Sequence, residues 1–209
     1  MTEWFELPTP PWPNSEADLL AGGDDWWFVA CMDWPRDAWI GYIEGYRKAA
    51  GLMLARVAET GRDQDYLVYP FLMCWRQHIE LQLKNLIIQC TRYKDEEVDF
   101  PRTHKLEVLW RKARKLLNEV YPDDTAAIDD VERLLLQLQA CDPTSEHFRY
   151  PVAKDGSPTL GALPRVHMRL FQEAMEGVAT YLDATDTGLR EKINSRDDYR
   201  AAMYDMYGQ

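Results

Sequence analysis

The motifs of several large enzyme classes are absent from this sequence. It contains no GxxxxGK[ST] phosphate-binding loop, no GxGxxG dinucleotide fingerprint and no GxSxG nucleophile elbow. Its four histidines stand in four separate segments and form no HxxxH or HExxH pair for a metal ion. The sequence therefore does not favour P-loop nucleotide hydrolysis, dehydrogenase chemistry or serine hydrolase chemistry. It predicts no metal site and no cofactor.

Cysteine is also scarce, and none of the four cysteines belongs to a CxxC pair. Widely spaced cysteines in apolar surroundings are usually small buried side chains, which favours a reducing compartment over disulfides. The first residues lack the basic and apolar regions of a signal peptide, and no window approaches ~18 uninterrupted apolar residues. These absences predict a cytoplasmic protein with no membrane partner.

Sustained alternation of apolar and polar residues is missing too, whereas apolar residues recur every three or four positions through most of the chain. This periodicity predicts long helices at about 35–60, 66–90, 103–120, 124–141 and 158–183, and a short sixth helix at about 197–206. The fold class is therefore predicted to be all-α: an antiparallel bundle of about five long helices at residues 35–185. A short C-terminal helix or tail is predicted to follow at residues 186–209.

Residues 1–34 differ from the rest of the chain. Prolines at positions 8, 10, 11 and 13 prevent a helix there, and Gly22 and Gly23 follow. Aromatic residues, including Trp26 and Trp27, recur along the segment. We expect a Pro/Trp-rich, non-helical N-terminal arm that packs against the body, a second copy or a partner protein.

Acidic residues outnumber basic ones, 35 to 24, but they are unevenly distributed. Residues 1–25 and residues 119–132 each carry six acidic residues and no Lys or Arg, whereas residues 102–115 carry six basic residues and one Glu. The basic segment suits a polar seam with an acidic neighbour, a solvated face or an RNA-facing patch. In the last case Lys105, Arg111 and Arg114 are the candidate RNA-binding residues.

The stretch WRQHIELQLK at residues 75–84 places Arg76, Glu80 and Lys84 four residues apart. Such i,i+4 charge pairs contribute only ~0.2–0.5 kcal/mol each and typically face solvent or a neighbouring helix. His78 lies between this row and the apolar stripe, where packing or an interhelical hydrogen bond is expected. If the row instead faces a ligand, Arg76, His78 and Lys84 are candidates for binding nucleic acid or a nucleotide.

Three further polar residues are candidates for chemistry. His104 opens the basic helix, where it suits either a bond to a neighbouring helix or the approach of a phosphate. His147 and Arg149 alternate with Phe148 and Tyr150 in the long loop 142–157, which is either functional or a pinned crossover. The last histidine, at position 167, is expected in the core on the apolar face of the helix predicted at 158–183.

The order of these motifs resembles the HEPN family of helical domains. The matching residues are Glu80, Leu83 and Lys84 for an E-x-x-L-K-like core, His104 and Leu106 for an H-x-L helix start, and Arg149, Tyr150 and Pro151 for an RYP-type turn before the last long helix. The resemblance covers roughly residues 36–185 and implies the helical bundle described above. Many members are metal-independent ribonucleases of toxin–antitoxin, CRISPR-associated and phage-defence systems.

The catalytic motif of those ribonucleases is Arg, four to six intervening residues, then His. No histidine of this sequence has an Arg at that spacing before it. The family also includes non-catalytic members that bind nucleotides or serve as assembly modules. The leading hypothesis is such a module, a homo-oligomer or part of a defence complex. A ribonuclease with a rearranged site, using His104 or His147 with Arg149, is the alternative, and a nucleotide sensor is a third.

Overall fold

The computed structural model describes residues 12–13, 15, 18–20, 22–24, 26–32, 37–98, 100–121, 127–161, 163 and 165–207. The chain divides into two compact units, residues 1–36 and residues 37–209. The predicted starts of the first and fourth helices, at Pro35 and at Asp123 or Asp124, lie outside the described residues. Pro164 also lies outside them.

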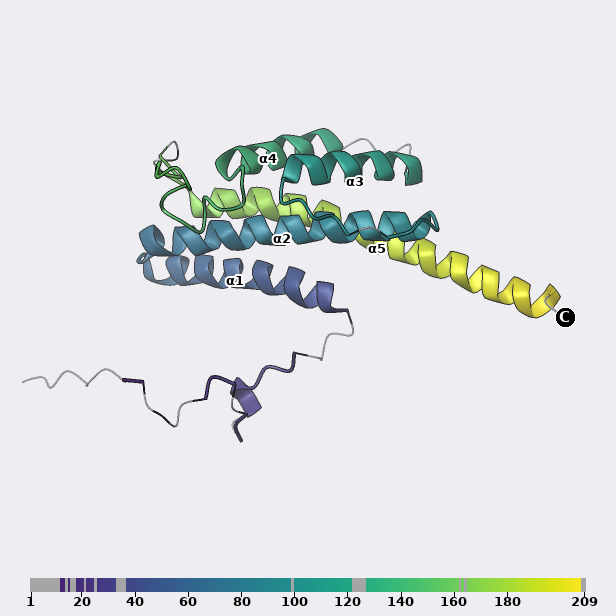
Figure 1. The fold of residues 1–209 in the computed structure, drawn as a ribbon, viewed down its shortest axis with the longest axis horizontal. Helices are drawn as coiled ribbons and strands as arrows, with labels where there is room; N and C mark the ends of the chain where they lie inside the picture. Colours follow the sequence, from purple (N-terminus) through teal and green to yellow (C-terminus); the bar gives the residue numbers. More distant parts are fainter. Residues whose placement is uncertain are drawn as a thin grey trace, which may run out of the picture. The chain divides into compact units, whose positions relative to one another are not determined.

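The unit 37–209 is all-α, as the periodicity predicts (Figure 1). Its helices are α1 (Ala38–Thr60), α2 (Gln64–Tyr93), α3 (Leu106–Val120), α4 (Ile128–Cys141) and α5 (Met168–Tyr207). Within the described ranges there is no strand, and the only β-type pairing is an isolated bridge between Val152 and Pro158. The fold is therefore a helical bundle in which one long irregular segment joins α4 to α5.

Helix α2 occupies the centre of the bundle, because α1, α3 and α5 all pack against it. Almost every residue from Phe71 to Thr91 is buried, and this stretch includes several charged and amide side chains. A helix covered on several sides cannot keep all of its polar residues in water. Its polar side chains must therefore find partners within the protein.

Two helix boundaries show how the sequence positions α1 against α2. Asp37 precedes α1, and its Oδ1 accepts a hydrogen bond from the Trp39 amide at 3.0 Å. Gly61 follows α1 with φ of 64°, a left-handed conformation that glycine adopts without strain, and its amide bonds Val57 O. A short turn then reverses the chain into α2.

The predicted helix at 158–183 begins later than expected. Ser157 does not cap a helix, because its amide and its hydroxyl both bond Asp155 Oδ1 within a turn. Helix α5 begins only at Met168, and the segment between α4 and α5 is longer than the predicted loop. His167 lies just before α5, exposed, and its Nδ1 accepts a hydrogen bond from the Leu170 amide at 3.3 Å. The expectation of a core histidine was wrong.

The predicted break near residue 185 is also absent, since α5 runs without interruption to Tyr207. No proline interrupts residues 168–207. Arg196 donates to the carbonyl oxygens of Arg92 and Tyr93, and Arg200 pairs with Asp95. These contacts fasten the C-terminal half of α5 to the end of α2, so the short sixth helix is a continuation of α5.

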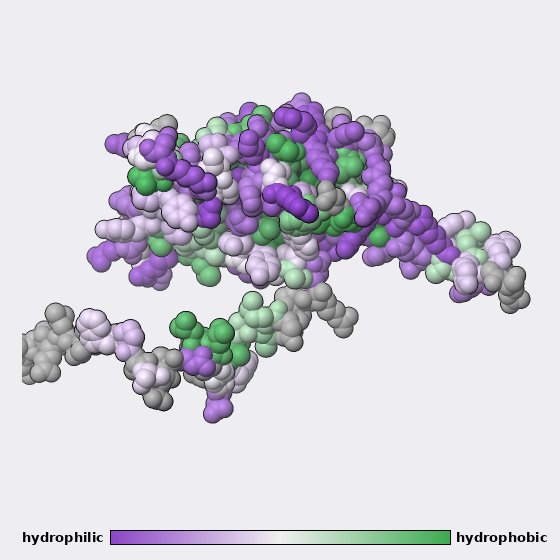
Figure 2. Space-filling model, viewed as in Figure 1, coloured by the Kyte–Doolittle hydropathy of each residue, from purple (hydrophilic) through white to green (hydrophobic). Residues whose placement is uncertain are grey.

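Within the unit 1–36, the described residues form a single 3₁₀ turn, Trp26–Phe28. The rings of Trp26 and Trp27 stack with centroids 3.7 Å apart. Trp12, Leu19 and Phe28 are exposed, and Figure 2 shows hydrophobic side chains on the surface of this unit. The expected docking of this arm on a body or a partner stays a prediction.

The cysteines fit the predicted absence of disulfides, since all four are free. Cys74 and Cys90 are buried and Cys141 is half-buried. Cys31 is exposed, so the expectation of a buried side chain was wrong at that position. Burial raises the pKa of the Cys90 thiol to about 12, which keeps it protonated and unreactive at neutral pH.

The central position of α2 gives a direct test of the packing. Leu83 is completely buried, and Leu83→Ala is expected to lower the free energy of unfolding by about 2–5 kcal/mol because it leaves a cavity in the core. Leu52 on α1 is 71% exposed, and Leu52→Ala is expected to change it by no more than about 0.5 kcal/mol. Urea unfolding followed by circular dichroism measures both. Equal effects would contradict the central placement of α2.

Candidate functional site

The charged row of α2 lies inside the protein. The side chains of Arg76, Glu80 and Lys84 are 2%, 0% and 5% exposed, respectively. Glu80 joins the row, because its Oε2 accepts from Arg76 Nη1 at 3.1 Å and its Oε1 lies 2.9 Å from Lys84 Nζ. The row therefore does not face solvent, and its partners from outside α2 lie in the segment before α3 and at the end of α4.

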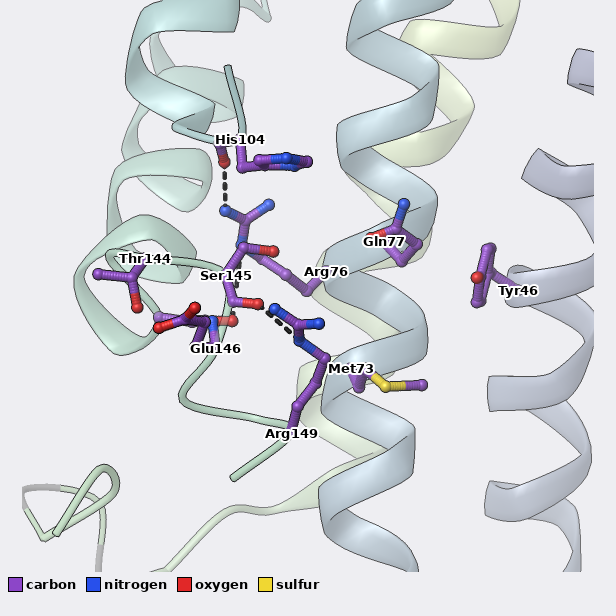
Figure 3. A pocket seen from close by; sticks show the side chains of 10 residues that line it. Tyr46, Met73, Arg76, Gln77, His104, Thr144, Ser145, Glu146 and Arg149 are labelled. Carbon is purple, nitrogen blue, oxygen red and sulfur yellow. Dashed lines mark hydrogen bonds and ion pairs between the residues drawn. The ribbon is translucent and has the colours of Figure 1, made fainter. Parts of the chain in front are cut away.

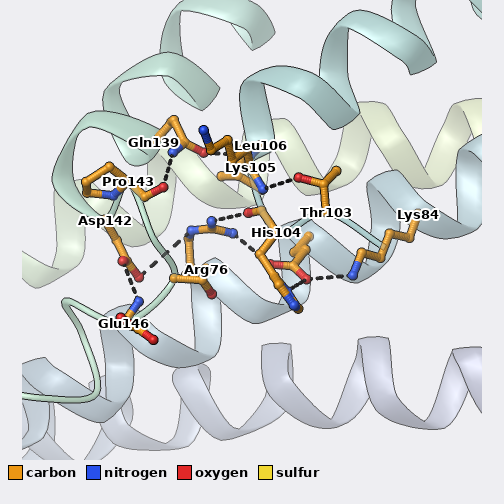
Figure 4. A network of polar contacts seen from close by, with 12 residues as sticks. Arg76, Lys84, Thr103, His104, Lys105, Leu106, Gln139, Asp142, Pro143 and Glu146 are labelled. Atoms are coloured by element: carbon orange, nitrogen blue, oxygen red, sulfur yellow. Dashed lines mark hydrogen bonds and ion pairs between the residues drawn. The ribbon is translucent and has the colours of Figure 1, made fainter. Parts of the chain in front are cut away.

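The third partner of Glu80 comes from the segment before α3. His104 Nδ1 lies 2.8 Å from Glu80 Oε1 (Figure 4). The ring is 64% exposed, so one edge of it meets the buried carboxylate while the remainder faces outward. A hydrogen on Nδ1 satisfies the ionised carboxylate and leaves Nε2 as the ring atom that can accept a proton or contact a ligand.

Arg76 connects α2 to two other segments. Its Nη2 donates to His104 O at 2.6 Å, and its Nε lies 4.0 Å from Asp142 Oδ2 at the end of α4. Burial lowers the pKa of Arg76, although the carboxylates of Glu80 and Asp142 act in the opposite direction. The nearby carboxylates favour the charged form of the guanidinium. Its burial is therefore compensated by two carboxylates and a carbonyl oxygen.

The segment that carries His104 is held by α4. Gln139 Oε1 accepts from the Leu106 amide at 2.6 Å, and its Nε2 donates to Pro143 O at 2.9 Å (Figure 4). Asp142, which is buried, accepts from the amides of Glu146 and His147. One end of α4 thus fixes both the His104 segment and the loop that follows Asp142.

These elements enclose a cavity of about 410 Å³ (Figure 3). Side chains of α1, α2, the segment before α3 and the loop after α4 line it. They are Tyr46, Met73, Arg76, Gln77, His104, Asp142, Thr144, Ser145, Glu146 and Arg149. Sequence reasoning named three of these residues as site candidates, Arg76, His104 and Arg149, and the structure brings all three to this one cavity.

Arg149 is the exposed cation of the cavity. Its Nε donates to Ser145 O at 2.8 Å, and its side chain extends toward Arg76 in Figure 3. Among the described residues no carboxylate pairs with it, and Glu146 on the same wall lies 3.4 Å from Lys154 Nζ. The two Nη groups of Arg149 therefore remain able to bind an anionic ligand.

A second donor of the cavity is unsatisfied. Arg76 Nε is buried and has no hydrogen-bond partner within the described chain, since Asp142 Oδ2 is too far away for a hydrogen bond. Buried donors without partners are uncommon and indicate a place where water or a ligand oxygen binds. Of the three candidates at this cavity, Arg149 is the one with an exposed guanidinium, while Arg76 and His104 form part of the wall.

Other predicted site residues lie elsewhere. His78 is completely buried, and its Nδ1 lies 2.9 Å from Ile43 O of α1. This is the interhelical hydrogen bond that the sequence predicted, and it makes His78 unsuitable for ligand binding. His147 lines two neighbouring cavities, one of which it shares with Arg149, but not the cavity of His104.

The basic face of α3 is partly a seam with α4. Arg114, a candidate for RNA binding, instead pairs with Glu132 and Asp129, so the polar seam, one of the three alternatives for the basic segment, is present at this position. Lys105 and Arg111 are exposed and remain candidates for contact with RNA. Sequence reasoning missed the roles of Tyr46, Gln77 and Asp142, because a tyrosine, a glutamine and a loop aspartate carry no motif that marks them.

The described residues hold no group of three or more His, Cys, Asp or Glu side chains arranged for a metal ion. In the same part of the chain, none of the helices has the length and apolar composition needed to cross a bilayer. No family model, curated protein or solved structure matches the chain. Function must therefore be argued from the cavity itself.

The buried carboxylate gives the first prediction for this site. Glu80→Gln removes the charge that compensates Arg76 and Lys84, and it is expected to lower the free energy of unfolding by about 3–5 kcal/mol. The matched control is Glu59→Gln, which removes an exposed i,i+3 partner of Arg56 and is expected to cost less than about 0.5 kcal/mol. Urea denaturation at pH 7 measures both. A small effect of Glu80→Gln would show that the buried cluster is not held by this charge.

His78 predicts a pH dependence of stability. Desolvation on burial lowers its pKa, outweighing the hydrogen bond to Ile43, so the folded state binds a proton less readily than the unfolded chain. The contribution of neutral His78 to the free energy of unfolding is complete above about pH 6.5, the ordinary pKa of histidine in an unfolded chain. This contribution is lost as the pH falls below that value. Wild type is expected to lose more unfolding free energy between pH 7.5 and pH 5.5 than His78→Asn. His167→Asn, at an exposed position, is expected to retain the wild-type loss, and an equal loss in His78→Asn would contradict the assignment.

Proposed function

We propose that the protein is a non-catalytic HEPN-like binding and assembly module, and that the cavity of Arg76, His104 and Arg149 binds a phosphate group of its ligand. The observation that carries the proposal is the exposed guanidinium of Arg149, with which no carboxylate of the described residues pairs, at a cavity whose wall also holds the buried guanidinium of Arg76. Guanidinium groups bind phosphate oxygens in pairs, and such charge-assisted bonds are stronger than neutral ones.

The HEPN-like part of the proposal has support from the way the three motifs meet. Glu80 and Lys84 lie on α2, His104 precedes α3 and Arg149 follows α4. Glu80 bonds both Lys84 and His104, and His104 lines the cavity with Arg149. Residues that carried the resemblance in three separate segments thus contribute to one site. A role in prokaryotic defence or a toxin–antitoxin pair, with a second copy or another protein as partner, follows from the resemblance only.

Isothermal titration calorimetry with pyrophosphate and with a nucleoside triphosphate tests the phosphate site. Arg149→Ala is expected to weaken binding about 10- to 100-fold, because it removes charge-assisted hydrogen bonds of roughly 1.5–3 kcal/mol. Arg133→Ala is the control, since Arg133 lies exposed on α4 and pairs only with Asp130 among the described residues. Equal affinities for wild type and Arg149→Ala, or no binding by wild type, would refute the phosphate site.

One observation favours a second candidate function, metal-independent RNA cleavage. Glu80 orients the His104 imidazole, as carboxylates orient catalytic histidines, and Arg149 stands at the same cavity. In that role His104 Nε2 would take the proton of a 2′-hydroxyl as its oxygen attacks phosphorus, and the 5′-oxygen would leave with a proton from water. Arg149 would stabilise the charge on the phosphoryl oxygens.

Incubating the protein with tRNA and with total RNA in the presence of a chelator separates the two functions. The binding module is expected to leave both RNAs intact. Cleavage that is lost in His104→Ala and in Arg149→Ala but kept in His147→Ala would refute the non-catalytic function and support the ribonuclease. His147 is the control because it does not line the His104 cavity.

A further inference from the structure

A second cavity, of about 470 Å³, adjoins the loop that carries Arg149. Its walls are mainly apolar and aromatic: Tyr69 of α2, Phe148, Tyr150 and Pro151 of the loop, and Pro158 and Leu160 farther along the chain. Phe148 is buried, whereas Tyr69 and Tyr150 are 51% and 55% exposed. Two half-exposed phenol rings at one cavity leave apolar ring surface that the protein itself does not cover.

Arg149 belongs to both cavities. Its guanidinium carbon lies 5.5 Å from the centre of the Tyr150 ring, so the cation and the aromatic wall are adjacent. A phosphate group held by Arg149 would therefore lie next to the aromatic wall of the second cavity.

The loop that forms the second cavity is held by its own hydrogen bonds. Thr159 donates from its hydroxyl to Tyr150 O at 2.7 Å and from its amide to Pro151 O at 3.2 Å. The amides of Arg149 and Tyr150 both donate to Glu146 O at 3.0 Å. The aromatic wall is therefore built before a ligand arrives, and little conformational entropy is lost when a flat ring enters.

We propose that this cavity is a subsite for a planar heteroaromatic ring, and that the ligand is a nucleoside phosphate whose base contacts Tyr69 and Tyr150 while its phosphate contacts Arg149 and His104. The proposal rests on the phosphate site proposed above. Aromatic side chains stack on every nucleobase, because each base has a π-face, and phosphate-binding cations beside them complete a nucleotide site. The nucleoside phosphate is either a free nucleotide or one unit of a single RNA strand.

The experiment compares ligands that differ only in the ring. Dissociation constants of the full-length protein are measured by calorimetry for the four nucleoside monophosphates, for ribose 5-phosphate and for a short single-stranded RNA. At least one nucleotide is expected to bind about 5- to 100-fold more tightly than ribose 5-phosphate, which is the range that stacking on one aromatic side chain produces. Tighter binding of the RNA than of every mononucleotide would identify the strand as the source of the ring.

The variants then assign the subsite. Tyr150→Ala and Tyr69→Ala are expected to weaken nucleotide binding about 5- to 100-fold and to leave ribose 5-phosphate unchanged, whereas Tyr150→Phe keeps the ring and the affinity. Tyr66→Ala is the matched control, because Tyr66 is an exposed tyrosine of α2, the helix that carries Tyr69, and it does not line the second cavity.

The two proposals fail in different ways. The ring subsite is refuted, and the phosphate site stands, if two results occur together. Ribose 5-phosphate binds as tightly as every nucleotide, and Arg149→Ala is the only variant that weakens the binding of ribose 5-phosphate and of the nucleotides. If none of these ligands binds the wild-type protein, both are refuted. If Tyr66→Ala weakens nucleotide binding as much as Tyr150→Ala does, the ring is bound elsewhere and the subsite is again refuted.

Discussion

Glu80 is the charge on which the polar interior of this protein depends. One buried carboxylate accepts bonds from Arg76 and His104 and pairs with Lys84. Removing such a carboxylate from water is costly, and several cationic or polar partners at hydrogen-bond distance are needed to offset that cost. Here the partners come from two separate segments, so compensating the charge also holds the start of α3 against α2.

The same network explains why a cavity exists at this place. Arg76 contacts Glu80, the carbonyl of His104 and Asp142, yet its Nε has no hydrogen-bond partner among the described residues. A core made only of apolar side chains at this position would close over such a space. The cluster instead forms a polar wall beside the loop of Arg149.

The central helix shows where periodicity stops being informative. An apolar stripe along one face predicted one buried side for α2, but α1, α3 and α5 cover most of its surface. Two amide side chains on the covered faces donate to α5: Gln82 donates to Asp183 and Asn85 donates to Asp186. Periodicity reports which residues share a face, whereas burial depends on how many neighbours a helix has. That number is a property of the whole bundle.

The sequence by itself determined the helical elements, because the spacing of apolar residues and the positions of Gly and Pro act over a few residues. It predicted an all-α bundle, and its alternatives included the interhelical bond of His78 and a polar seam between the basic and acidic helices, both of which the structure has. It could not predict that Ser157 would turn back on Asp155, or that Arg196 and Arg200 would fasten α5 to the end of α2.

Only the tertiary structure decided which candidates meet. Glu80 and His104 are 24 residues apart, and the bond from Arg76 to the His104 carbonyl spans 28 residues. No spacing rule connects residues on different helices, since their separation depends on the crossing of the helices and on the path of the loops. The packing of α2 against the ends of α3 and α4 placed His104 and Arg149 at one cavity and His147 at another.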